Sequence, residues 1–76
     1  MEIKIVGSNC KEGTTLYKMT NRAAKSVFQN VQIEKLDDVN SINKYGVKNI
    51  PGLVINNKLV SEGKALKEKE ISKLMQ

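Results

Sequence analysis

The chain has 76 residues with one cysteine and no histidine, so it cannot build an internal disulfide or the usual Cys/His zinc site. A chain of this size must be stabilised by regular secondary structure around one core. Its 39% of hydrophobic residues is sufficient for one small domain over residues 1–76. We therefore expect neither a metal nor a cofactor.

The net charge of +5 raises the question of nucleic-acid binding, but the pattern argues against it. The 13 basic residues are spread from Lys4 to Lys73, and only 4% of residues are aromatic. Nucleic-acid modules usually cluster Lys and Arg and add stacking aromatics. No apolar run has membrane-spanning length, and the N-terminus lacks a signal-peptide pattern. We expect a cytoplasmic protein with a reduced thiol, bound to neither nucleic acid nor membrane.

The first part of the chain predicts a strand followed by a long helix. Ile3 and Ile5 alternate with polar residues before Gly7, which is typical of a strand with a buried face. Apolar residues then recur at spacings of three and four, which predicts a helix that begins at residue 11 or 14 and ends at Gln29. The core-facing side of this helix would contain Leu16, Met19, Ala23, Ala24, Val27 and Phe28.

The middle of the chain predicts a second strand and a short helix. Alternating Val31 and Ile33 indicate a strand over residues 31–36. Asp37 and Asp38 then supply an N-cap for a short helix that Gly46 ends. The apolar residues of this helix would be Val39, Ile42 and Tyr45. A strand, helix and strand connected in this way imply that the first two strands are parallel.

The last part of the chain predicts a hairpin and a closing helix. Asn56 and Asn57 separate two apolar runs over residues 53–55 and 58–61, and asparagine tolerates the positive φ of a tight turn. Residues 67–75 have the periodicity of an amphipathic helix with Ile71, Leu74 and Met75 on its apolar side. The predicted element order is therefore βαβαββα.

Cys10 lies between the first strand and the first helix, where free backbone N–H groups and the helix dipole stabilise a thiolate. If the helix begins at residue 11, the thiol is at its N-terminus. If Gly13 breaks the first turn, Thr14 or Thr15 becomes the N-cap and Cys10 lies in a longer loop. The polar neighbours of Cys10 favour an exposed loop over a buried position.

Three segments together resemble a known family. They are Gly7-Ser8-Asn9-Cys10, Lys44-Tyr45-Gly46-Val47, and Ile50-Pro51-Gly52-Leu53-Val54-Ile55-Asn56-Asn57-Lys58-Leu59-Val60. In this order they are similar to the small thioredoxin-like proteins called redox-active disulfide protein 2. The resemblance covers essentially the whole chain. It implies an α/β, thioredoxin-like fold with a four-stranded mixed sheet flanked by three helices.

The resemblance also implies roles for individual residues. Cys10 takes the place of the nucleophilic cysteine, and Pro51 takes the place of the cis-proline opposite it. The backbone at Ile50, next to Pro51, would face Cys10 and bind an extended substrate segment. Gly13 occupies the position of the resolving cysteine. Because that second sulfur is missing, the chain cannot close an intramolecular disulfide.

These roles predict a thiol-disulfide exchange of the monothiol type. Cys10 would attack a protein or small-molecule disulfide, and an external thiol such as glutathione or a second protein would resolve the intermediate. The alternative is a redox-inactive binding module with the same fold. A third hypothesis is a thiol sensor or a Cys10-linked dimer of a chain that is otherwise monomeric. Replacing Gly13 with cysteine is expected to create an oxidisable pair of thiols.

Overall fold

The computed structural model describes residues 1–26 and 30–75. Its elements follow the predicted order, which confirms the α/β fold class. They are β1 (Glu2–Val6), α1 (Lys11–Lys25), β2 (Gln32–Leu36), α2 (Val39–Lys44), β3 (Gly52–Ile55), β4 (Lys58–Glu62) and α3 (Glu68–Met75). No helix in the described ranges is both long enough and apolar enough to cross a membrane.

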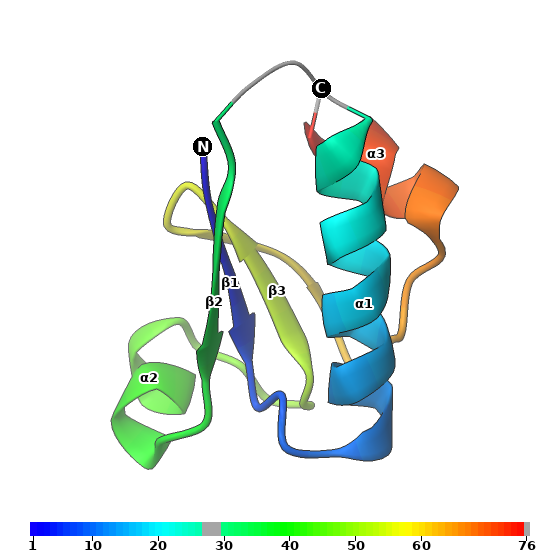
Figure 1. The fold of residues 1–76 in the computed structure, drawn as a ribbon. Helices are drawn as coiled ribbons and strands as arrows, with labels where there is room; N and C mark the ends of the chain where they lie inside the picture. The colour runs from blue at the N-terminus through cyan, green and yellow to red at the C-terminus, as the bar shows by residue number, and fades with distance from the viewer. Residues whose placement is uncertain (27–29, 76) are drawn as a thin grey trace.

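The four strands form one mixed sheet in the order β2-β1-β3-β4. Strands β1 and β2 are parallel, as predicted, whereas β1 with β3 and β3 with β4 are antiparallel. Helices α1 and α3 lie on one face of the sheet and α2 lies on the other (Figure 1). The sheet is therefore the middle layer of three.

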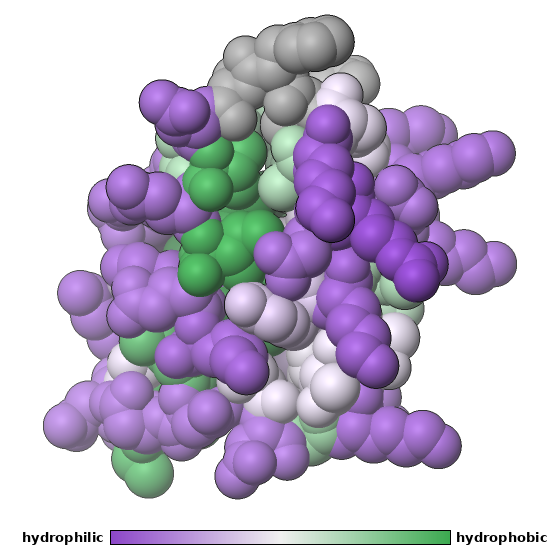
Figure 2. Space-filling model, viewed as in Figure 1, coloured by the Kyte–Doolittle hydropathy of each residue, from purple (hydrophilic) through white to green (hydrophobic). Residues whose placement is uncertain are grey.

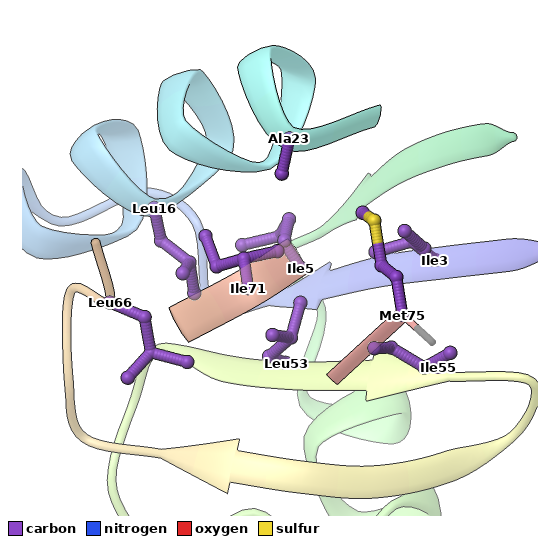
Figure 3. Packing of buried hydrophobic residues seen from close by; sticks show 9 residues of the cluster. All are labelled: Ile3, Ile5, Leu16, Ala23, Leu53, Ile55, Leu66, Ile71 and Met75. Atoms are coloured by element: carbon purple, nitrogen blue, oxygen red, sulfur yellow. The ribbon is translucent and has the colours of Figure 1, made fainter. Parts of the chain in front are cut away.

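The main core lies between the sheet and the pair α1 and α3 (Figure 3). Alternate residues of β1 and β3 point to this face because side chains of a strand alternate between its two sides. The buried residues are Ile3, Ile5, Leu16, Ala23, Leu53, Ile55, Leu66, Ile71 and Met75. A smaller cluster of Val6, Val47 and Val54 packs on the opposite face, with Ile42 and Tyr45 beside it.

The lysines lie on the solvated surface, as their spacing suggests. Lys18, Arg22 and Lys25 of α1 are all exposed. Hydrophilic residues cover most of the face shown in Figure 2, and apolar residues gather between β2 and α1. Met19 of α1 and Ile33 of β2 are partly buried and pack against the core.

Some predicted boundaries and faces differ from the structure. Helix α1 is described over Lys11–Lys25, and the N–H and Oγ of Ser26, which follows it, both donate to the Ala23 carbonyl. The predicted helical residues 27–29, including Val27 and Phe28, lie outside the described residues. Strand β2 begins one residue after Val31.

Leu74 of α3, which was predicted on the apolar side of its helix, is 40% exposed and lies outside the core. Ile71 and Met75 are one turn apart and make the buried stripe of this helix, whereas Leu74 lies on its flank.

The turn between β3 and β4 and the N-cap of α2 both agree with the sequence prediction. Asn56 and Asn57 both have positive φ, 50° and 68°, and they connect β3 to β4 as predicted. Asp38, not Asp37, is the N-cap of α2 and accepts a hydrogen bond from the N–H of Ser41.

Val39 was expected on the apolar side of α2 but is 69% exposed. Helix α2 is only 6 residues long and contacts the sheet near its C-terminal end.

Candidate functional site

The candidate site lies at the edge of the sheet where β1 ends and β3 begins. Val6, the last residue of β1, is paired with Gly52, the first residue of β3. The turn that follows β1 therefore lies beside the segment that precedes β3 (Figure 1). Cys10 belongs to the first of these segments, and Ile50 and Pro51 belong to the second. The topology thus brings together sequence-predicted residues that are about forty positions apart.

Cys10 is the N-cap of α1, which begins at Lys11. Its backbone is extended, with φ −102° and ψ 170°, and its Sγ accepts a hydrogen bond from the Gly13 N–H at 3.3 Å. The thiol in turn donates to the Gly7 carbonyl at 3.5 Å. The side chain is half-buried, so the sulfur is neither in the core nor in an open loop. The earlier of the two predicted helix starts is therefore the observed one.

Gly7 brings the cysteine turn into contact with the segment before β3. Its φ of +76° favours glycine, and a Cβ on it would lie 2.6 Å from the Cβ of Ile50. The Ile50 side chain thus packs directly on the Gly7 backbone, and the Gly7 carbonyl holds the Cys10 thiol. Gly7 therefore contacts both Ile50 and Cys10.

Ile50 and Pro51 differ in exposure. The peptide bond between them is cis. The Pro51 side chain is fully buried, and its carbonyl accepts from the Gly63 N–H at 2.9 Å. Ile50 is 47% exposed and is one of the few large apolar side chains at the surface of the described residues. The Ile50 side chain is therefore accessible to solvent next to the turn that carries Cys10, whereas the Pro51 side chain is packed inside the protein.

Sequence reasoning missed the part played by Ser8 and Asp37. Ser8 is only 6% exposed, and its Oγ donates to the Asp37 carboxylate at 2.7 Å. The pair Asp37 and Asp38 was expected to supply the N-cap of α2; Asp38 does so, and Asp37 instead binds Ser8 in the turn that carries Cys10. A signal was present, because Asp37 directly follows β2, and the carboxyl ends of the parallel strands β1 and β2 meet at one edge.

The described side chains do not form a metal site. Within residues 1–26 and 30–75, no three or more His, Cys, Asp or Glu side chains converge on one point.

Comparisons with known proteins agree with this geometry. A family model described as a thioredoxin domain matches residues 1–76. A curated thioredoxin from Methanothermobacter thermautotrophicus is 28% identical over 75 residues, which are 99% of this chain and 97% of that protein. The family supports a thioredoxin-like redox function, and proteins of this kind act on protein thiols and disulfides. The chain belongs to the thioredoxin domain family.

Proposed function

We propose that this protein exchanges thiols and disulfides through Cys10 alone, as a monothiol member of its family. The observation that carries the proposal is the position of the sulfur at the N-cap of α1, half-buried and hydrogen-bonded by the Gly13 N–H. Only a thiolate attacks a disulfide, and an N–H donor at a helix N-terminus stabilises that anion.

The proposed reaction has two steps. The Cys10 thiolate attacks one sulfur of a substrate disulfide, forming a mixed disulfide and releasing the other substrate sulfur as a thiolate. A thiolate from another molecule then attacks the substrate sulfur of this mixed disulfide and frees Cys10. The released substrate sulfur is reduced and the external thiol is oxidised, so the cycle needs no other reductant. The chain contains no second sulfur that could carry out the second step.

Ile50 is the proposed contact for the substrate. Its half-exposed side chain lies on Gly7, whose carbonyl holds the Cys10 thiol, so a segment bound along Ile50 would present a disulfide to the sulfur. Pro51 would fix the backbone from its buried position. Glutathione and protein thiols are the proposed external thiols, and the cytoplasm is the proposed compartment because thiols are reduced there.

One observation favours a second function, a binding module without turnover. The resolving position is glycine, so the chain alone cannot release a trapped substrate, and the apolar surface of Ile50 would serve binding equally well. A Cys10-linked dimer is the related possibility, because a half-buried sulfur at the surface can pair with a second copy.

The test is the glutathione-dependent reduction of a mixed disulfide between glutathione and a small peptide. We expect catalysed release of the peptide thiol by the wild-type chain, and only the uncatalysed rate with Cys10→Ser. Equal rates for the two proteins would contradict exchange and leave the binding module. A disulfide-linked dimer that accumulates during the assay and is not reduced by glutathione would also contradict the proposal.

A further inference from the structure

Gly13 is buried in the first turn of α1 at a place that has no room for a side chain. A Cβ on Gly13 would lie 2.6 Å from the Ser8 Cα and 2.8 Å from both the carbonyl carbon and the carbonyl oxygen of Ser8. These neighbours are backbone atoms, so they cannot rotate away as a side chain can. The turn before α1 thus packs directly on the helix, at a position where only glycine fits.

Two hydrogen bonds hold the turn in this place. The Ser8 hydroxyl donates to Asp37 at 2.7 Å, and the Gly7 N–H donates to the Leu36 carbonyl at 2.7 Å. Both acceptors belong to β2 or to the residue that follows it. The turn cannot move away from Gly13 without breaking a bond to a different strand.

The turn that packs on Gly13 leads directly into Cys10, whose sulfur accepts a hydrogen bond from the same glycine. With the turn closed on the helix, the Gly13 N–H lies 3.3 Å from the Cys10 Sγ. We infer that Gly13 is a positioning residue for Cys10. Its missing side chain lets the turn close, brings the N–H to the sulfur, and commits the site to an external resolving thiol. The need for an external thiol rests on the proposed function, whereas the closure of the turn and the N–H contact with the sulfur do not.

This inference corrects an expectation from the sequence. The family pattern alone predicts that Gly13→Cys restores a pair of oxidisable thiols. In the structure, a Cβ at this position would meet the backbone of Ser8, so a cysteine fits here only if the turn before α1 shifts. The glycine is therefore part of a different, compact arrangement and not simply a cysteine that has been lost.

The first test compares Gly13→Ala with Thr15→Ala, an exposed position in the same helical turn. The readouts are the thermal midpoint and the rate of Cys10 alkylation by iodoacetamide as a function of pH. We expect G13A to lower the midpoint and to slow alkylation at neutral pH about tenfold, the effect of losing one hydrogen bond to a charged group. T15A should alter neither. Equal behaviour of the two variants would overturn the inference.

Ser8→Ala provides an independent variant that adds no atoms. It removes the bond to Asp37, so the turn loosens and the Gly13 N–H contact weakens while the fold is kept. We expect severalfold slower alkylation of Cys10, and a smaller loss of stability from G13A in the S8A background than in the wild type. Alkylation at the wild-type rate in S8A, or strictly additive stability losses, would contradict the inference.

Gly13→Cys tests the commitment to an external thiol. After treatment with diamide and glutathione, intact mass should show mainly glutathione adducts and little internal disulfide in this variant. Complete internal disulfide formation with an unchanged thermal midpoint would overturn the inference. Failure of the proposed function looks different, because it would appear as a wild-type chain without exchange activity, whatever G13A does to alkylation.

Discussion

The two capped helices of this protein use the same geometry with different atoms. In α1 the Cys10 sulfur accepts from the N–H three residues on, at 3.3 Å, and in α2 an Asp38 carboxylate oxygen does the same at 3.1 Å. Asp38 also accepts from the Ser41 hydroxyl at 2.8 Å. These bonds from Ser41 lower the pKa of the Asp38 carboxyl. The Asp38 carboxylate thus accepts more hydrogen bonds than the Cys10 sulfur, although α2 is the shorter of the two helices.

The difference between the two caps supports the chemical role proposed for the sulfur of Cys10. Sulfur is a weak hydrogen-bond acceptor, and Ser, Thr, Asp and Asn are the residues that stabilise helix N-termini. Helix α1 is the longer one and covers the main core, so the better cap would be expected there if stability decided the choice. A weak cap on the longer helix thus supports the proposed chemical role of Cys10, whereas Asp38 is the cap that stabilises its own helix.

The largest effect that separates the two caps is on exchange activity. Cys10→Ser should reduce thiol-disulfide exchange to the uncatalysed rate while keeping or raising the thermal midpoint, since serine is a good N-cap. The matched variant Asp38→Ser should keep full activity. Thermal unfolding and the exchange assay check both proteins. A fall in stability of the Cys10 variant by several kcal/mol would mean that the sulfur has a structural role instead.

A second effect concerns the turn that carries the first cap. Gly7→Ala should lower the free energy of unfolding by about 1–3 kcal/mol, because alanine resists the positive φ and its Cβ meets Ile50. Gly46→Ala is the matched control, since Gly46 also has positive φ but nothing lies within 4 Å of its added Cβ. Gly46→Ala should lower the free energy of unfolding by less than Gly7→Ala does. Equal losses in denaturant unfolding would show that the contact with Ile50 does not matter.

The smallest expected effect is the pH dependence of the second cap. Because the pKa of Asp38 is lowered in the folded state, its ionised form adds stability at pH values above its ordinary pKa of 3.8. That stability is lost as the pH falls through the lower, folded-state pKa. Asp38→Asn, which caps without titrating, should give a flatter stability curve between about pH 5 and pH 2. Superimposable curves would contradict the role of the charge.

Local patterns predicted most of the fold. The alternation of Ile3 and Ile5, the stripe through Leu16 and Ala23, and the Asn56–Asn57 turn each depend on residues close in sequence. The strand, the helix and the turn that these patterns predict are all present in the structure.

The site was predicted less completely because it depends on contacts between distant segments. The start of α1 could not be decided from the sequence, since the cost of glycine in a helix is only about 1 kcal/mol and packing can override it. The deciding contact is between Gly13 and the backbone of Ser8, and it depends on the bond from Ser8 to Asp37 across to β2. The burial of Pro51 behind an exposed Ile50 likewise follows from tertiary packing.

The most direct test of a chemical role for Cys10 is the mass of the folded protein after brief exposure to oxidised glutathione at neutral pH. The account predicts one glutathione adduct on Cys10, formed faster than on an unstructured peptide with the same residues 7–13 and removed by added thiol. Adduct formation only after unfolding in denaturant, or at a rate no faster than in the peptide, would contradict it.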